Sequence, residues 1–510
     1  MKIQRLMAAI LALMMAASMT ACSGDSAPAG SNPPAAPAEP GETAASGEKD
    51  WSTQEPYTVK LMLPGVAAAE DCAEIAELAS EITRAKFNTT IEIGRSGFGT
   101  YDQEVNLMLT SGEKLDMLYS GRGTFVSSVN NGQIVEIGQY LDEYAPEMKA
   151  AISAEDWQTV TVGSGIYAVP ANKEKATAWG FVMNKEIADS TGIDYTQIKT
   201  EEDLEPLLRK VKEMYPDMYP VVSNGGTMDT MTTIDDLGGD YGVLNAADPN
   251  ARTVVNKYAE EEYREIVERR YRWGQEGLIM PDAVTNTDPW ASLVSSGRAF
   301  GRFTNVKPGI EAEQTKNAGI ELVVIPLTEA YTTTTRLDIL WYVAHNSEKP
   351  ERTVQVMNEI YTNPELQNIL ANGIEGKHYE YNNAEKTLVG YPEGVSGANT
   401  GYPSYPWAWL NEMITPVWEG SEVTLWEETQ QYNADAIASP AKGFSWDNSA
   451  VMNEVTACNN VVSKYANALE CGSVDPASAL PDFLAELEAA GIDAIIAEKQ
   501  SQLDAWFAAQ

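Results

Sequence analysis

The amino-acid sequence predicts an α/β protein of two lobes, each built as a sheet flanked by helices. Segments with strand-like alternation and segments with apolar residues spaced three and four apart follow one another along most of the chain. About 450 residues follow the N-terminal region, which is more than one hydrophobic core usually supports. Strand signals also return late in the chain, after a long helical stretch. The chain is therefore expected to cross between the lobes more than once.

The N-terminus has the features of a signal peptide that ends before a cysteine. Two basic residues precede an apolar run at 6–19, which is shorter than the roughly 20 residues that a membrane-spanning helix needs. Small residues at 20–21 would admit a signal peptidase, and the thiol of Cys22 can accept a diacylglyceryl group. Residues 1–21 are therefore predicted to be removed and Cys22 to carry a lipid anchor, since two acyl chains hold a protein stably at a membrane. The alternative is an ordinary secretory signal, with Cys22 incidental.

A flexible linker is predicted at 22–55. Ala, Pro, Gly and Ser dominate there, and aliphatic residues are too few to offset the entropy of ordering the chain. The folded part is expected to run through the lobes in this order: 56–172 mainly in the first lobe, 173–297 mainly in the second, 298–345 back in the first, and 346–510 mainly in the second.

Charge and cysteine content exclude some classes of function. The sequence has 35 basic and 74 acidic residues, a formal net charge of −39, spread along the chain. Nucleic acid is therefore not expected as a partner, because binding phosphate needs a basic surface. The four cysteines, of which Cys22 would be lost to lipid, do not make a disulfide framework. Cys458 and Cys471 are expected to be buried thiols, and a disulfide between them is the less favoured alternative.

The first lobe begins with a repeated pattern of strand and helix. Strands are expected at 57–63, 89–94 and 114–119, with helices at 75–85 and 101–110 between them. This alternation predicts a parallel sheet covered on both faces. Ligands bind such sheets beyond the carboxyl ends of the strands, which singles out the loops at 64–66 and 120–122. In the second loop, Ser120 and Arg122 could hydrogen-bond a ligand, with a surface salt bridge as the alternative for Arg122.

A second α/β unit is predicted to begin near residue 173. The expected elements are a hairpin arm at 165–170, a strand at 178–184, helices at 185–191, 200–214 and 258–273, strands at 298–304, 320–325 and 339–344, and helices at 351–361 and 364–371. Thr200 and Asp203 have the spacing of a capping box at the start of the second of these helices.

Aromatic residues give the clearest signal of a ligand site. Tyrosine and tryptophan, with 23 and 12 copies, outnumber the 9 phenylalanines, and such rings combine an apolar face with a polar edge, as a sugar ligand requires. The densest cluster lies at 402–409, where two prolines stiffen the chain. The predicted ligand contacts are Trp179, Tyr405, Trp407, Trp409, Trp290 and Trp341, together with Ser120 and Arg122. Packing in a core is the alternative for the rings, and it is the favoured interpretation for Trp341, Trp418 and Trp426.

No constellation typical of an enzyme is present in the sequence. The motifs of serine hydrolases, zinc proteases, dithiol oxidoreductases and P-loop proteins are absent, and the only histidines are His345 and His378. His378 is expected to pack and hydrogen-bond. Asp235 and Asp236 could serve a glycosidase, but neighbouring carboxylates arise by chance among 74 acidic residues. The sequence therefore predicts no catalytic residue, no metal site and no other cofactor. It has no convincing calcium-binding loop, and a structural calcium held by carboxylates that meet only in the fold stays open.

Several stretches resemble the bacterial family 1 extracellular solute-binding proteins. They are the lipobox-like step before Cys22 and the stretches 112–121, 165–170, 180–194 and 339–381. The stretches 373–379, 442–447 and 473–508 resemble the LipO-type lipoprotein subgroup, which has its own C-terminal region; Trp446 stands where that subgroup suggests phenylalanine. The resemblance implies a periplasmic-binding-protein-like fold of type II and delivery of a carbohydrate to an ABC importer.

The expected function is capture without chemistry. Two lobes close about a hinge over an oligosaccharide, and the closed form docks on the permease subunits of an ABC importer. The protein is expected to be a monomer, anchored by its lipid to the extracellular face of the cell membrane. Two alternatives stay open: a binding lipoprotein for a peptide, polyamine or other small solute, and a surface glycoside hydrolase.

Overall fold

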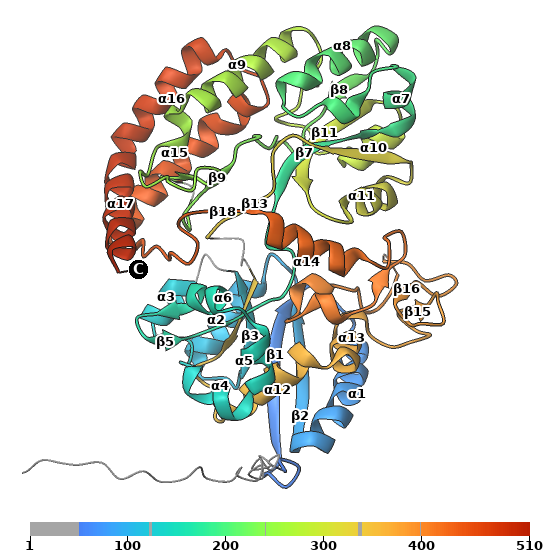
Figure 1. Cartoon of the computed structure of the whole chain (residues 1–510), viewed down its shortest axis with the longest axis vertical. Helices are drawn as coiled ribbons and strands as arrows, with labels where there is room; N and C mark the ends of the chain where they lie inside the picture. The colour runs from blue at the N-terminus through green and yellow to red at the C-terminus, as the bar shows by residue number, and fades with distance from the viewer. Residues whose placement is uncertain (1–49, 122–124, 240, 335–338, 398, 510) are drawn as a thin grey trace, which may run out of the picture. The chain divides into compact units, whose positions relative to one another are not determined.

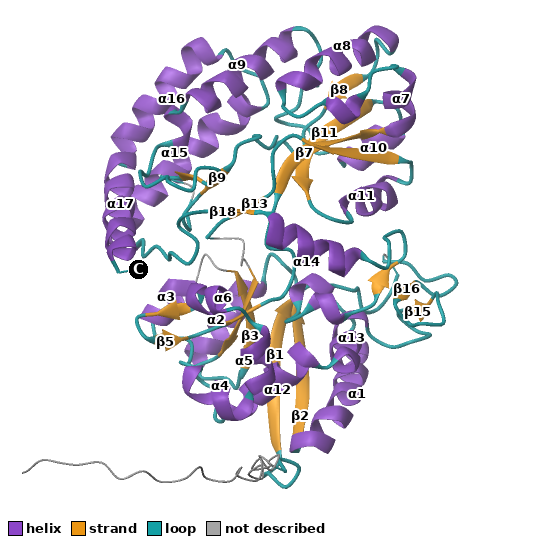
Figure 2. Ribbon diagram, in the orientation of Figure 1, coloured by secondary structure: helices purple, strands orange, loops and turns teal. Residues whose placement is uncertain are grey.

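Two β-sheets organise the fold of the chain (Figures 1 and 2). The computed structural model describes residues 50–121, 125–239, 241–334, 339–397 and 399–509. The predicted signal peptide and Cys22 lie outside the described residues. Among the helices that are described, none combines the length and the apolar character needed to cross a membrane.

The first sheet has the strand order β2-β1-β3-β14-β6. Its strands are β1 (Tyr57–Pro64), β2 (Thr89–Ser96), β3 (Met117–Gly121), β14 (Ile339–Val343) and β6 (Val169–Pro170). β1 runs parallel to β2 and β3, as the alternation of strand and helix predicts. β14 is antiparallel to both β3 and β6, so the sheet is mixed and not wholly parallel. The parallel half places the ends of β1, β2 and β3 at one edge.

Helices and a short hairpin cover the first sheet. They are α1 (Ala69–Phe87), α2 (Tyr101–Ser111), α3 (Phe125–Asn130), α4 (Gly138–Tyr144), α5 (Pro146–Ala151), α6 (Ala154–Thr159), β4 (Thr161–Val162) with β5 (Gly165–Ile166), α12 (Pro350–Thr362) and α13 (Pro364–Asn372). We call this sheet and the elements packed on it the first lobe. α12 and α13 contribute Val354, Met357 and Leu366 to the core that contains β1 and β14. The prediction that 346–510 lies mainly in the second lobe is therefore wrong for these two helices.

The second sheet has the strand order β12-β7-β11-β8. Its strands are β7 (Ala178–Asn184), β8 (Tyr219–Val221), β11 (Ala299–Val306) and β12 (Leu322–Pro326). Because β11 and β12 both pair with β7, the prediction that 298–345 returns to the first lobe is wrong for them, and only β14 pairs with the first sheet. The first six residues of β11 are all buried. A strand buried on both faces carries no alternation that would indicate which sheet it joins.

Two groups of helices accompany the second sheet, and we call them, with that sheet, the second lobe. α7 (Lys185–Ser190), α8 (Glu205–Met214), α10 (Trp290–Ser295) and α11 (Ile310–Ala318) contact its strands. α9 (Glu261–Gln275), α15 (Met452–Glu470), α16 (Pro476–Ala490) and α17 (Ile492–Ala508) form a helical layer. This layer has a core of its own, in which the ring of Tyr258 contacts the rings of both Tyr263 and Phe483. The small strands β9 (Ile234–Asp235) and β10 (Leu244–Asn245) pair with each other.

Side-chain hydrogen bonds determine where two helical segments begin. The Oγ1 of Thr200 accepts from the Asp203 N–H at 3.2 Å, and Oδ2 of Asp203 accepts from the Thr200 N–H at 3.0 Å. The predicted capping box is therefore confirmed, although it opens a short 3-10 turn, Glu202–Leu204, that leads into α8. Asn184 caps α7 by accepting from the Ile187 N–H.

Among the described residues, three segments that run between the lobes are hydrogen-bonded side by side. They are residues 171–177 between β6 and β7, β13 (Tyr331–Thr332) after β12, and β18 (Ile437–Ala438) after α14 (Leu425–Asp435). β13 pairs with β18, and Tyr331 exchanges backbone hydrogen bonds of 2.8 and 2.9 Å with Thr177. Short connections that change their φ and ψ together can act as a hinge. The remaining strands, β15 (Glu380–Tyr381), β16 (Leu388–Gly390) and β17 (Val417–Trp418), form a small sheet.

Candidate functional site

Three aromatic rings meet beyond the carboxyl ends of β1 and β2, and we call Phe98, Tyr405 and Trp407 the aromatic platform. Phe98 lies between two glycines just after β2, and its side chain is 56% exposed. Its ring is nearly parallel to Trp407, with centroids 6.2 Å apart, and nearly perpendicular to Tyr405 at 5.8 Å. Tyr405 and Trp407 are half-buried. The platform thus offers solvent an apolar face with polar ring edges beside it.

The backbone at Gly65 and the guanidinium of Arg95 pack against the tyrosine ring of the platform. A Cβ at Gly65, where β1 ends, would lie 2.6 Å from Cε2 of Tyr405, and the φ of +104° also favours glycine there. Glycine therefore lets the tyrosine ring lie against the chain. The Arg95 guanidinium lies 4.3 Å from the ring centroid of Tyr402 and 5.5 Å from that of Tyr405. The platform tryptophan belongs to a 3-10 helix, Pro406–Ala408, whose proline restricts the backbone.

A cavity of about 230 Å³ lies beside Trp407 and contains buried charges. Trp418 and Trp426 also line it. The Nζ atoms of Lys173 and Lys307 each lie 3.3 Å from Oε1 of Glu174, and the Glu412 carboxyl, in a residue only 6% exposed, hydrogen-bonds to Glu174. We call Lys173, Glu174, Lys307 and Glu412 the hinge cluster, because the first two residues lie on the crossing segment 171–177.

The two carboxyl groups of the hinge cluster have opposite pKa shifts. Burial and the neighbouring charge of Glu174 raise the pKa of Glu412 to about 8. Burial would also raise the pKa of Glu174, but the ammonium groups of Lys173 and Lys307 outweigh it and lower this pKa to about 2. These opposite pKa shifts favour a protonated Glu412 beside an ionised Glu174 at neutral pH.

Two of the predicted ligand contacts, Trp179 and Trp290, lie in the second lobe and are half-buried. Nε1 of Trp179 donates to Oη of Tyr331 at 2.8 Å, which connects this ring to the hinge. The Arg302 guanidinium lies 4.6 Å from the ring centroid of Trp290. Burial lowers the pKa of Arg302 and raises the pKa of Asp229, and each of these charges partly opposes the shift of the other. An indole, a cation and a carboxylate therefore come together on this side.

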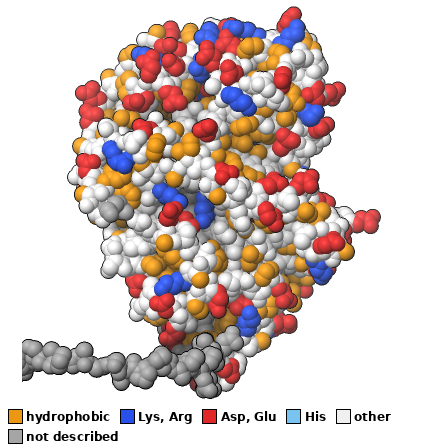
Figure 3. Space-filling model, viewed as in Figure 1, with side chains coloured by type: hydrophobic (Ala, Val, Ile, Leu, Met, Phe, Trp, Pro, Cys, Tyr) orange, Lys and Arg blue, Asp and Glu red, His pale blue; other side chains and the backbone are white. Residues whose placement is uncertain are grey.

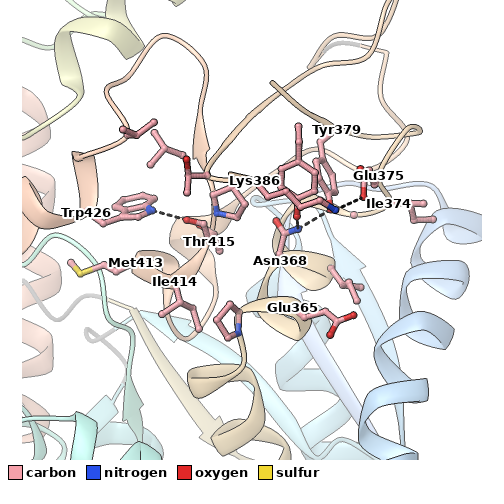
Figure 4. Close-up of a pocket in the computed structure, with 18 of the residues that line it drawn as sticks. Glu365, Asn368, Ile374, Glu375, Tyr379, Lys386, Met413, Ile414, Thr415 and Trp426 are labelled. Atoms are coloured by element: carbon pink, nitrogen blue, oxygen red, sulfur yellow. Dashed lines mark hydrogen bonds and ion pairs between the residues drawn. The ribbon is translucent and has the colours of Figure 1, made fainter. Parts of the chain in front are cut away.

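A larger cavity, of about 770 Å³, is lined by residues of α13, α14, β15 and β17, and no platform residue lines it (Figure 4). Within it, Oη of Tyr379 accepts from Nδ2 of Asn368 at 2.8 Å, and Nε1 of Trp426 donates to the Thr415 carbonyl at 2.7 Å. The polar edges of these rings are already bound inside the protein. We therefore assign the candidate site to the aromatic platform, where a ring is exposed at the edge of the sheet.

Acidic side chains outnumber basic ones over the protein as a whole. Figure 3 shows Asp and Glu side chains scattered over the face in view, and the sequence carries 74 of them against 35 Lys and Arg. Such a surface repels anionic polymers and leaves uncharged ligands unaffected.

Comparison with known proteins identifies the family. Residues 77–376, more than half of the chain, match the family model described as bacterial extracellular solute-binding protein. The chain belongs to the bacterial extracellular solute-binding proteins. The resemblance found in the sequence is thereby confirmed, and membership in a family of binding proteins agrees with the prediction that the chain is not an enzyme. Residues 440–508 of this solute-binding protein match a second model, a domain of unknown function (DUF3502), and include α15 to α17.

Individual relatives of this solute-binding protein extend the comparison. A carbohydrate ABC transporter substrate-binding protein of Streptococcus pneumoniae serotype 4 is 25% identical over 441 residues, which are 84% of this chain and 87% of that protein. The N-glycan transport solute binding protein NgtS from Streptococcus pneumoniae has a TM-score of 0.78 at 23% identity, over 88% of this chain and 98% of that one. An HMO binding solute binding protein from Bifidobacterium longum infantis has a TM-score of 0.61 at 14% identity, over 89% and 99%. These likenesses confirm the predicted two-lobed fold.

The structure brings together only part of the predicted ligand contacts. Tyr405 and Trp407 lie in the platform, and Ser120 lies at the carboxyl end of β3, opposite Leu340. Arg122 lies outside the described residues. Trp418 and Trp426, for which a core position was favoured, are half-buried and line the cavity beside Trp407.

Trp341 and Trp409 belong to the core of the solute-binding protein. Both side chains are 0% exposed, and their rings stack with centroids 5.6 Å apart. Nε1 of Trp341 donates to the Ala408 carbonyl at 3.0 Å. The prediction that Trp409 contacts a ligand is therefore wrong, because its ring packs on β14 inside the first lobe. Trp341, also among the predicted ligand contacts, occupies the core position that was its favoured interpretation.

Residues considered for catalysis or pairing have structural roles. His378 is 2% exposed and its Nδ1 accepts from the Ile374 N–H at 3.0 Å, which confirms its predicted packing and hydrogen bonding. The fully buried Asp235 accepts from Thr334 N–H at 2.9 Å and from its Oγ1 at 2.7 Å, so it ties β9 to a crossing segment. Cys458 and Cys471 are free and buried, as favoured.

Sequence reasoning missed Phe98 and the hinge cluster. A phenylalanine between two glycines directly after a strand was an available signal for Phe98. The hinge cluster had no comparable signal, because its members come from distant positions and meet only in the fold.

Proposed function

We propose that this protein captures an oligosaccharide and delivers it to an ABC importer. The observation that carries the proposal is the aromatic platform, an exposed ring and two half-buried rings beyond the ends of parallel strands. Sugars present apolar C–H faces that stack on such rings and hydroxyl edges that hydrogen-bond. The relative named for carbohydrate, and the structural neighbours named for N-glycan and HMO, support the same ligand class.

Closure of the lobes about the hinge supplies the signal to the permease. A ligand that contacts both the platform on the first lobe and the tryptophans of the second lobe favours the closed form, because only the closed form makes both sets of contacts. The hydrogen bonds among the three crossing segments guide this motion. No bond of the ligand is broken, and the permease subunits of the importer recognise the closed form.

The same proposal includes a lipid anchor at Cys22, after removal of residues 1–21. The family description supports an extracellular location, and the small-residue step before Cys22 supports the anchor. The linker at 22–55 then lets the protein, acting as a monomer, reach both its ligand and the permease at the outer face of the cell membrane.

Titration calorimetry with the uncharged Man1GlcNAc and Man5GlcNAc tests the ligand class; these are ligands named for structural neighbours. We expect binding of at least one of them without cleavage. Trp407→Ala should weaken it about tenfold or more, the usual loss for one aromatic contact. The matched control is Trp51→Ala, which removes a half-buried tryptophan that packs on Tyr144. Binding of a peptide with no response to any oligosaccharide would favour the small-solute alternative, and chromatographic detection of cleaved sugar would favour a hydrolase.

A further inference from the structure

A separate cavity lies between the C-terminal region and the first lobe. Its volume is about 470 Å³. Asn130 of α3, Gln158 of α6 and the β4–β5 turn line one wall. Residues 443–447 and Trp506 of α17 line the other. The cavity is thus bounded by the part of the chain that matches the domain of unknown function.

Hydrogen bonds fix the position of Asp447 in the wall formed by the C-terminal region. The Asp447 N–H donates to Oε1 of Gln502 at 2.9 Å, and its carbonyl accepts from Nε2 of the same residue at 2.8 Å. The Asp447 carboxylate accepts from the Ser449 N–H at 3.0 Å and from Nδ2 of Asn130, across the cavity, at 3.2 Å. A fixed carboxylate with hydrogen-bonding capacity left on its oxygens can accept hydroxyl groups.

An aromatic face completes this wall. The ring of Trp506 is half-buried and lies 6.1 Å from Phe444 and 5.1 Å from Phe507, which fixes its orientation. Gly443 lies between Trp506 and Gln158: a Cβ there would sit 3.6 Å from the ring and 3.7 Å from the amide. With a φ of +95°, this position favours glycine, and the absence of a side chain keeps the indole accessible. An indole beside a carboxylate and two amides is the lining expected of a saccharide site.

The cavity and the aromatic platform belong to the same edge of the first sheet. Phe98 follows β2, whereas α3, which carries Asn130, follows β3 in the chain. In the strand order β3 lies two positions from β2, and β6, which α6 with Gln158 contacts, lies four positions from β2, so the cavity is about two to four strand spacings, or roughly 10 to 20 Å, from the end of β2. An oligosaccharide of several units that stacks on the platform can extend along this edge towards Trp506.

We propose that this cavity is a distal saccharide subsite, in which a terminal sugar unit stacks on Trp506 and hydrogen-bonds to Asp447, Asn130 and Gln158. The proposal rests on the proposed function and deepens it: the ligand is an oligosaccharide of several units. Contacts with the C-terminal region then make the affinity higher for a long oligosaccharide than for a short one. A mono- or disaccharide on the platform leaves the subsite empty.

Calorimetry with a short and a long probe tests the subsite. Man1GlcNAc and Man5GlcNAc share one sugar chemistry and differ in size. Trp506→Ala should weaken Man5GlcNAc about tenfold and leave Man1GlcNAc within about twofold. Asp447→Asn, which keeps the shape of the side chain, should have the same selectivity and provides a second variant if the tryptophan variant folds poorly. Trp407→Ala should weaken both probes.

A control variant next to the cavity distinguishes an effect of lost ligand contacts from an effect of lost contacts between the two walls. Nζ of Lys442 lies 2.6 Å from Oε2 of Glu155 next to the cavity, and neither residue lines it. Lys442→Ala should change the affinity for both probes by the same factor. Wild-type affinity for Man5GlcNAc in both Trp506→Ala and Asp447→Asn, with loss in Trp407→Ala, would overturn the subsite and leave the proposed function intact. Failure of the wild-type protein to bind either probe would overturn the oligosaccharide function and the subsite with it.

Discussion

Replacing Glu412 by glutamine should remove a pH dependence of stability that the hinge cluster builds into the fold. The pKa of Glu412 is raised to about 8 and that of Glu174 is lowered to about 2, each from an ordinary value of 4.5. Between about pH 5.5 and 7.5 the folded pair keeps one proton, whereas the unfolded chain, with both carboxyl groups at the ordinary pKa of 4.5, keeps almost none. Since the folded state binds more protons, its stability falls as the pH rises through this window.

The size of the effect follows from the number of protons. One proton changes the free energy of unfolding by about 1.4 kcal/mol per pH unit, so the loss across about pH 5.5 to 7.5 is about 3 kcal/mol. Glu174 acts in the opposite sense, because its lowered pKa contributes stability above pH 4.5 that is lost as the pH falls towards 2. The contribution of the pair is therefore most favourable near pH 4.5.

Glutamine keeps the shape of Glu412 and can donate its amide N–H to Glu174, but it does not titrate. Urea unfolding at a series of pH values, followed by tryptophan fluorescence, measures the effect. The stability of Glu412→Gln relative to wild type should rise by about 1.4 kcal/mol per pH unit between about pH 5.5 and 7.5. Glu419→Gln, at an exposed position, is the matched control and should show no such rise. Parallel stability curves for Glu412→Gln and wild type would refute the assignment of the proton to Glu412.

Three further predictions concern the core, the anchor and a buried ion pair. Trp341→Ala should cost about 3 to 5 kcal/mol in urea unfolding and leave the affinity of the folded fraction unchanged; weaker binding at unchanged stability would return this ring to the site. Cys22→Ala should move the protein from the detergent phase to the aqueous phase in membrane fractionation, and retention in the detergent phase would reject the lipid anchor. Arg270 and Glu201 form a bidentate pair with bonds of 2.9 and 3.2 Å at 0% and 4% side-chain exposure. Arg270→Met should therefore destabilise the protein by about 3 to 5 kcal/mol in the same assay, and adding Glu201→Gln should recover part of that loss. Equal stability of the single and double variants would indicate that Arg269, whose Nη1 lies 3.8 Å from Oε1 of Glu201, compensates the buried carboxylate.

The secondary structure was largely predictable because its signals are local. Alternation over 57–63 and 89–94 corresponds to β1 and β2, and the spacing of Thr200 and Asp203 corresponds to a capping box with both hydrogen bonds made. Periodicity and capping depend on residues a few positions apart, so a single sequence contains them. The family resemblance rested on stretches of the same short range.

Which sheet a strand joins was not predictable from the same signals. β11 and β12 pair with β7 in the second lobe, and α12 and α13 pack on the first lobe, both contrary to expectation. A buried strand or an amphipathic helix shows that it has an apolar face, but it does not show which of two cores receives that face.

The candidate site divides in the same way. The sequence by itself determined that aromatic residues gather at 402–409 and that proline stiffens them, but it left a ligand contact and a core position open for Tyr405 and Trp407, which the structure shows half-buried. Only the tertiary structure decided that Trp409 stacks on Trp341 in the core, that Phe98 joins the platform, and that Glu174 and Glu412 meet with opposite pKa shifts. Exposure of a ring and the pKa of a carboxyl both depend on partners far away in the chain, and only folding brings those partners into contact.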